Sequence, residues 1–181
     1  MRTILTEQKN PTLREVARKV PISDIGSQRI QSLIREMKSL LSKEAYGVAL
    51  AAPQVGEPLK LFIVSGRALA RDSRNAPDEP DKKEDVPPLP DQVYINPELT
   101  KISRAKSEKH EGCLSLRGKW GTVKRAEKAT IQAYDELGRK FTRGASGFLA
   151  HIFQHEMDHL EGILYTDKAT HVYDDKPEAK K

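Results

Sequence analysis

The feature that most constrains this chain is the pentapeptide His155-Glu156-Met157-Asp158-His159 in its C-terminal quarter. On a helix, positions four apart lie on one face, so both imidazoles can reach one ion while Glu156 sits beside them. In this HExxH arrangement two neutral imidazole nitrogens bind a metal, and a carboxylate is placed to take a proton from water. Phe148 and Ile152 extend the same face toward the N-terminus. We therefore predict a helix that carries a half-buried metal site at the end of an apolar stripe.

The third ligand of such a site is best supplied by Cys113, the only cysteine of the chain. A zinc endopeptidase would take this ligand from a downstream glutamate, but Glu161 follows the second histidine too closely and Glu178 lies near the C-terminus. A lone cysteine is more often a small core residue than a ligand. This one stands in Glu111-Gly112-Cys113-Leu114-Ser115, where the glycine lets the backbone come close. A thiolate and two imidazoles would leave a fourth position open for water, as a hydrolytic site requires.

The length of 181 residues suits a single domain with a sizeable core, and we expect one domain over residues 1–181. One cysteine excludes an intrachain disulfide. No apolar stretch approaches the ~20 residues that span a bilayer, and the polar N-terminus shows no secretory signal. These features predict a cytoplasmic protein that does not contact a membrane.

The net charge of +5 is concentrated between residues 101 and 128. The cations of this stretch are Lys101, Arg104, Lys106, Lys109, Arg117, Lys119, Lys124, Arg125 and Lys128, and its anions are Glu108, Glu111 and Glu127. A solvated basic rim explains the excess, and a contact with a polyanion or with carboxylates is the alternative. A transient contact with the ribosome belongs to this alternative, whereas nothing in the sequence predicts specific DNA binding.

The first half of the chain predicts one amphipathic helix and one strand. From Asp24 to Lys43, apolar residues recur at three- and four-residue steps, which is typical of a helix packed on a core. Residues 60–64 (KLFIV) predict a buried strand. Residues 65–92 hold five of the eleven prolines among charged residues, so we expect an exposed loop there.

The second half predicts further strands and the helix with the HExxH motif. Strands are expected at 93–95 and 128–134, with a turn and a return strand at 140–142. The last helix should begin after Ser146 and end near Gly162, and a short charged tail is expected at 167–181. Strands and helices alternate without a βαβ rhythm. The predicted fold class is therefore α+β, with antiparallel or mixed strands packed around a central C-terminal helix that carries HExxH.

Three segments resemble the signature motifs of the peptide deformylase family, in the family's order and spacing. They are GVALAAPQ at 47–54, EGCLS at 111–115 and QHEMDH at 154–159. The resemblance covers most of the chain. It implies a metal-dependent hydrolase that removes the formyl group from the N-terminal N-formylmethionine of newly synthesised polypeptides, a step of N-terminal methionine processing in protein biosynthesis. It also implies Fe(II) as the physiological ion, with Zn(II), Ni(II) or Co(II) as substitutes.

The same resemblance assigns roles to individual residues. The implied metal ligands are Cys113, His155 and His159. Water activated by the metal would attack the formyl carbon with Glu156 as general base and acid, while the Gln54 side chain and the Leu114 N–H stabilise the oxyanion. The implied pocket for substrate consists of Val48, Ala49, Phe148 and Ile152. Asp158 is expected to pair with Arg125 and so to steady the helix that carries the histidines.

The sequence departs from the family pattern at two places. Ala49 stands where the first motif has its second glycine, so either a positive φ there is strained or the position requires only a small residue. After EGCLS, Leu116-Arg117-Gly118 replaces the usual apolar residue, proline and glycine, and Arg117 and Trp120 therefore affect the predicted substrate contacts.

Two other functions fit parts of the sequence. An HExxH zinc endopeptidase would cleave internal peptide bonds and would not require Cys113. A basic ribosome- or RNA-binding module would bind in a salt-sensitive manner that survives the loss of Glu156.

Overall fold

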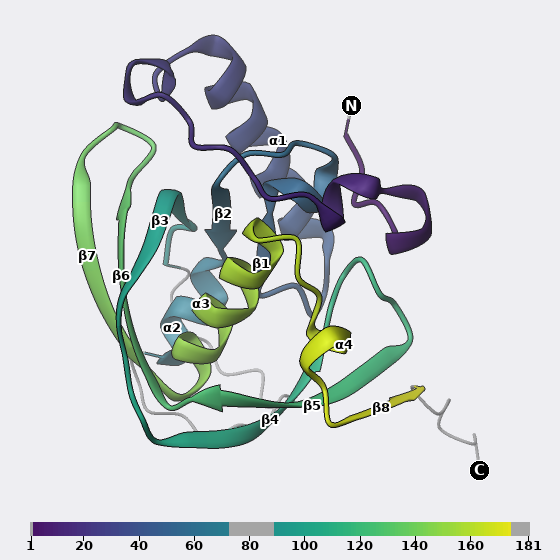
Figure 1. Cartoon of the computed structure of the whole chain (residues 1–181). Helices are drawn as coiled ribbons and strands as arrows, with labels where there is room; N and C mark the ends of the chain where they lie inside the picture. Colours follow the sequence, from purple (N-terminus) through teal and green to yellow (C-terminus); the bar gives the residue numbers. More distant parts are fainter. Residues whose placement is uncertain (1, 73–88, 175–181) are drawn as a thin grey trace.

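The computed structural model describes residues 2–72 and 89–174, and within them the chain forms two antiparallel sheets with a helix between them (Figure 1). The five-stranded sheet has the order β1 (Ala49–Ala51), β2 (Leu61–Val64), β3 (Gln92–Ile102), β6 (Lys128–Tyr134) and β7 (Lys140–Ser146). The three-stranded sheet has the order β4 (Lys106–Gly112), β5 (Lys119–Ala126) and β8 (His171–Asp174). Helix α3 (Gly147–Leu160) contacts strands of both sheets. The predicted α+β class with a central C-terminal helix is therefore confirmed.

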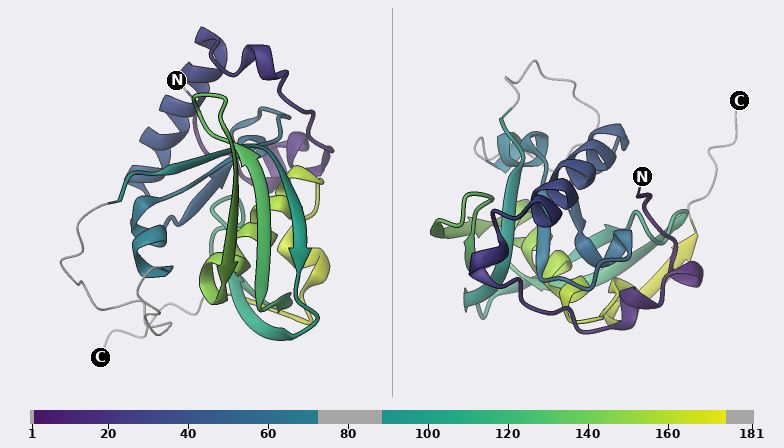
Figure 2. Two further views of the ribbon diagram at one scale, coloured as in Figure 1. Left: turned by 90° about the vertical axis from the view of Figure 1, so that its left-hand side faces the viewer. Right: turned by 90° about the horizontal axis from the view of Figure 1, so that it is seen from above.

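The alternation of side chains along the strands divides the core into two layers. Leu61 and Ile63 of β2 pack with helix α1 (Gln28–Lys43), whereas Phe62 and Val64 face the opposite side and pack with α3. Figure 2 shows α1 lying across one side of the five-stranded sheet. The sheet thereby separates α1 from the helix that bears the HExxH motif.

The predicted first helix is confirmed, except for its start. The structure has a 3-10 turn at Ile22–Asp24, and the α-helix begins only at Gln28. Ser27 is the N-cap, because its hydroxyl accepts a hydrogen bond from the backbone N–H of Ile30. The apolar stripe is buried as expected, with Ile30, Leu33, Ile34, Met37 and Leu41 in the core.

The prediction of a loop over 65–92 is wrong at its N-terminal end. Residues Gly66–Asp72 form helix α2, and β3 begins at Gln92. The prolines that suggested a loop start only at Pro77, whereas Ala68, Leu69 and Ala70 are apolar and buried. The remainder of the predicted loop, 73–88, lies outside the described residues.

The predicted hairpin at 128–142 is confirmed and extends further than expected. Strand β6 has the predicted bounds, and Gly138 closes the turn with a φ of +77°. Strand β7 runs on to Ser146, well past the predicted end. It lies at the edge of the sheet and alternates between exposed and half-buried residues, so it lacks the apolar signal from which a strand is predicted.

The predicted charged tail at 167–181 is wrong in its first part. Helix α4 (Tyr165–Lys168) and strand β8 follow α3, and β8 pairs with β5. Tyr165 anchors this segment, since its ring is buried and its hydroxyl donates to the carbonyl of Lys119. Residues 175–181 lie outside the described part. No helix among the described residues combines the length and the apolar character needed to cross a membrane.

Candidate active site with a metal cluster

Helix α3 begins and ends where the sequence predicts. Ser146 still has extended dihedral angles, and Gly147 turns the chain into the helix with a φ of +54°. Gly162 follows the helix with a φ of +72°, and a Cβ at this position would meet the backbone of Arg14 at 2.9 Å. Glycine is therefore required at position 162, both because φ is positive and because the backbone of Arg14 leaves no room for a side chain.

Three predicted ligands from two segments meet at one point. Cys113 follows strand β4, whereas His155 and His159 lie one turn apart on α3. Their candidate ligand atoms all lie within 4.8 Å of one another, and the Cys113 Sγ is 3.3 Å from His159 Nε2.

The residues of this cluster fit a divalent metal. Two imidazoles and a thiolate are ligands that zinc and other borderline first-row metals accept. Two buried atoms beside them, Glu156 Oε2 and His159 Nδ1, have no hydrogen-bond partner in the described structure. Buried polar atoms without partners are costly, so an unpaired carboxylate oxygen next to a ligand cluster indicates a place for water or substrate.

Burial and neighbouring charges shift the pKa values of the cluster in different directions. Burial raises the pKa of Glu156 to about 7. Burial also lowers the pKa of His159, and the charge of His155 lowers it further. The pKa of His155 is raised against the effect of burial, because this ring contacts Cys113 and Glu111.

Behind the cluster, a buried carboxylate connects β4 and β5 to the helix. Glu111 accepts hydrogen bonds from Arg125 at 2.6 and 3.0 Å and lies 2.7 Å from Nδ1 of His155. Arg125 also donates to Asp158 at 2.6 Å, which is the pair that the family resemblance implies. Burial alone would raise the pKa of Glu111, but hydrogen bonds from His151, His155 and Arg125 hold it well below its usual value.

The two expected oxyanion donors flank Cys113. The side-chain oxygen of Gln54 accepts a hydrogen bond from the Ala51 N–H at 2.8 Å, which fixes the orientation of the amide. Its Nε2 consequently points to the cluster, 3.5 Å from Cys113 Sγ and 3.4 Å from Ser115 Oγ. The backbone N–H of Leu114, the next residue, makes no hydrogen bond within the described residues.

The four expected pocket residues lie in one apolar cluster. Ala49 and Ile152 are buried there, and Val48 and Phe148 pack against them while partly exposed. The guanidinium of Arg71 lies over the Phe148 ring at 4.4 Å. The structure therefore brings together residues from the β1 segment and from α3, as the resemblance implies.

The two departures from the family motifs have clear structural settings. Ala49 lies in β1, and the only non-glycine residue with a positive φ in the described chain is Asn96. Alanine is therefore unstrained in β1, and the position requires only a small side chain. Arg117 pairs with Glu44 at 2.6 Å, and the Trp120 ring covers Gly112, where a Cβ would meet it at 3.2 Å.

Sequence reasoning missed two residues of the site. The sequence patterns assign no role in the site to Glu111 or His151. His151 Nε2 lies 2.8 Å from Glu111 Oε1. The signal was present in the sequence, because residues 151, 155 and 159 are histidines at four-residue spacing.

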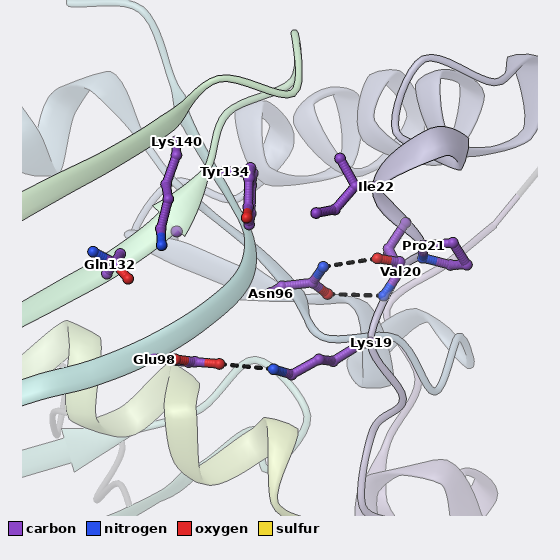
Figure 3. A pocket seen from close by; sticks show the side chains of 10 residues that line it. Lys19, Val20, Pro21, Ile22, Asn96, Glu98, Gln132, Tyr134 and Lys140 are labelled. Atoms are coloured by element: carbon purple, nitrogen blue, oxygen red, sulfur yellow. Dashed lines mark hydrogen bonds and ion pairs between the residues drawn. The ribbon is translucent and has the colours of Figure 1, made fainter.

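A separate cavity of about 380 Å³ lies between residues 19–22 and strands β3, β6 and β7 (Figure 3). At one wall of the cavity, the Asn96 amide accepts a hydrogen bond from the Val20 N–H and donates one to the Val20 carbonyl. Lys19 pairs with Glu98 at the rim. None of the predicted site residues lines this cavity. The candidate chemistry therefore belongs to the cluster around Cys113 and not to this hollow.

Comparison with known proteins gives consistent matches. The family model for polypeptide deformylase matches residues 1–174. A relative from Solanum lycopersicum, "Peptide deformylase 1A, chloroplastic", is 39% identical over 88% of this chain and 56% of its own length. A peptide deformylase from Desulforudis audaxviator is 34% identical over 93% of this chain and 94% of its own length. The chain thus spans little more than half of the plant relative and nearly all of the bacterial one.

A solved structure agrees in fold. The Met-Ala-Ser-bound class I type b peptide deformylase from Acinetobacter baumannii has a TM-score of 0.77 and is 28% identical. The match covers 93% of this chain and 98% of that one.

Proposed function

This chain belongs to the polypeptide deformylase family, and from that membership we propose that it removes the formyl group from N-formylmethionine at the start of new polypeptides. The observation that carries the proposal is the meeting of Cys113, His155 and His159 beside the unpaired Oε2 of Glu156. This combination of metal ligands and a nearby base is the one that metal-dependent hydrolases of carbonyl compounds use. The family match does not favour an endopeptidase or a purely RNA-binding module.

In this proposal Cys113, His155 and His159 hold the metal, with Fe(II) as the resident ion and Zn(II), Ni(II) or Co(II) as substitutes. When bound, the ion supplies Lewis acidity to the carbonyl oxygen and lowers the pKa of water. His155 donates from Nδ1 to Glu111, so its Nε2 remains for the ion.

Glu156 moves the proton. Its buried carboxylate takes a proton from the attacking water as the new bond forms at the formyl carbon. The same carboxyl group then gives a proton to the departing nitrogen as the carbon–nitrogen bond breaks. The products are formate and a free amino terminus. The open Oε2 and a pKa raised by burial support both halves of this role.

Gln54 and Leu114 stabilise the negative charge that develops on the formyl oxygen. Gln54 Nε2 is held in place by the bond between its Oε1 and Ala51, and the Leu114 N–H lacks a partner in the described structure. Fixed donors of this kind cost no reorganisation when the charge appears.

The substrate would bind as an extended strand along β1. This strand lies at the end of the sheet order, and its neighbour on the other side is β2. An added peptide strand could use its free edge, while Val48, Ala49, Phe148 and Ile152 take the methionine side chain.

We also propose that the partner is the nascent chain at a bacterial-type ribosome, and hence that the protein is cytoplasmic. The cations Lys106, Lys119 and Lys124 are exposed on β4 and β5. A transient contact of residues 101–128 with ribosomal RNA would place the site near its substrate.

The test is hydrolysis of formyl-Met-Ala-Ser by the wild type and by the variants Glu156→Ala and Cys113→Ala, with metal analysis of each. We expect both variants to lose activity, with metal retained by Glu156→Ala and weakened by Cys113→Ala. Near-normal turnover by Glu156→Ala would contradict the mechanism. Cleavage of internal peptide bonds by Cys113→Ala would instead support an endopeptidase.

A further inference from the structure

His151 shares a face of α3 with the two metal-binding histidines but cannot share their ion. A helix rises about 1.5 Å per residue, so residues 151 and 159 are about 12 Å apart along the axis. The cluster uses His155 and His159 together with Cys113. The imidazole of His151 is nevertheless largely buried, with 12% of its side chain exposed.

The His151 ring contacts the carboxylate of Glu111, which lies behind the three predicted metal ligands. His151 Nε2 lies 2.8 Å from Glu111 Oε1, and His155 Nδ1 lies 2.7 Å from Glu111 Oε2. Arg125 adds one donor to each oxygen, Nε to Oε1 at 2.6 Å and the terminal nitrogen to Oε2 at 3.0 Å. Each oxygen of the carboxylate therefore lies within 3.0 Å of two nitrogen atoms.

These contacts tie Glu111 to three successive turns of α3. His151 and His155 contact it from two successive turns, and Arg125 connects it to Asp158 on the turn after these. The donor from Arg125 comes from strand β5, so His151 is the contact that holds the Oε1 edge directly to the helix. Without that contact the carboxylate would be held directly to the helix through Oε2 and His155 alone.

We propose that His151 is a positioning residue of the metal centre, which acts through Glu111 to fix the ring of His155 with Nε2 toward the ion. Groups that orient a ligand imidazole in this way typically change metal affinity 10- to 100-fold when they are removed. The inference rests on the proposed function in one respect, since it takes Cys113, His155 and His159 as the ligands.

The test compares two amide substitutions that differ by one methylene group. In His151→Gln the side-chain nitrogen reaches about the position of the imidazole Nε2, whereas in His151→Asn it stops near the position of Nδ1. Each metal-free protein is titrated with Co(II) in competition with a chelator, and the visible spectrum of the Co(II) form is recorded. We expect His151→Gln to bind within about 3-fold of the wild type, and His151→Asn to bind about 10-fold more weakly or worse with a changed spectrum.

Three controls separate the outcomes. His171→Asn removes an exposed histidine of β8 and should bind Co(II) as the wild type does. Far-UV circular dichroism of the metal-free proteins checks folding, and His151→Leu, which fills the volume without a donor, replaces His151→Asn if that variant does not fold. If the wild type itself bound no Co(II), the proposed function would fail.

The inference about His151 is overturned by two results. In one, the variant without a donor binds Co(II) as tightly as the wild type and has the same spectrum. In the other, His151→Gln is as weak as the variant without a donor, which would show that hydrogen bonding to Glu111 is not what the ring contributes.

Discussion

At the scale of single residues, the site depends on polar side chains that are oriented by one hydrogen bond and direct their remaining polar atom toward Cys113. The Gln54 amide is an example, because its oxygen is occupied by Ala51 and only its nitrogen faces Cys113. The sequence alone predicts that Gln54 lies near the site. It cannot show whether the oxygen or the nitrogen of the amide is hydrogen-bonded to the backbone. That orientation depends on the backbone of η4 (Ala52–Val55), which brings Gln54 back over β1.

The first prediction concerns this amide. Gln54→Glu keeps the shape and an acceptor for Ala51 but places a carboxylate oxygen where the donor stood. We expect kcat for a formyl-Met peptide to fall by about 10²–10³, with the bound metal content unchanged. Steady-state kinetics with metal analysis checks this, and a variant with near-normal kcat would remove Gln54 from the mechanism.

The second prediction concerns Ala49, where the family motif has glycine. Because the residue is extended in β1, glycine would gain nothing from its freedom of φ and would cost entropy. We expect Ala49→Gly to lower the free energy of unfolding by about 0.5–1 kcal/mol. Urea denaturation measures this change. A stabilised variant would show that alanine is strained at this position.

At the scale of elements, the helices were predictable because their apolar residues are periodic. The stripes of α1 and α3 repeat at three and four residues and are buried in the structure. Strands β4 and β5 gave no such signal, because their exposed residues are mostly charged and their buried residues include Glu111 and Arg125. In a sequence, the residues of a buried ion pair cannot be told from charged surface residues. The hairpin of β4 and β5, which precedes and follows Cys113, could therefore not be predicted from alternating apolar residues.

The third prediction tests this buried ion pair. Arg125→Leu leaves Glu111 and Asp158 without their shared partner in a site where Arg125 is 4% exposed. Breaking a buried pair in this way typically costs about 3–5 kcal/mol. We expect a loss of that size in the free energy of unfolding, measured by denaturant titration of the metal-free proteins.

The matched control for that variant is Arg139→Leu. Arg139 pairs with Asp135 in the exposed hairpin turn, and 73% of its side chain is exposed. Its removal should change the free energy of unfolding by about 0.5 kcal/mol or less. Equal losses for the two arginines would contradict the view that Glu111 needs Arg125 as a buried partner.

At the scale of the whole molecule, the two sheets place the candidate site and the basic surface on connected elements. Helix α3 lies between the sheets (Figure 1). Strand β4 ends at Gly112, directly before Cys113. Lys106 of β4 and Lys124 of β5 are exposed, whereas Glu111 and Arg125 have the opposite parity on the same strands and are buried. The local charge excess was visible in the sequence, but its separation from the buried ion pair follows from strand alternation in the folded hairpin.

The last prediction uses this separation. The triple variant Lys106→Ala, Lys119→Ala and Lys124→Ala removes three exposed cations that do not line the metal cluster. If they contact ribosomal RNA, the slope of log K for ribosome binding against log salt concentration should fall in magnitude by about 2–3, while hydrolysis of a formyl-Met tripeptide stays unchanged.

A matched triple variant of exposed lysines outside the basic stretch, Lys9→Ala, Lys43→Ala and Lys140→Ala, carries the same loss of charge. Sedimentation with ribosomes at several salt concentrations measures both. If the two triple variants lose affinity equally, the contact reflects net charge alone, and the surface of β4 and β5 has no special part in it.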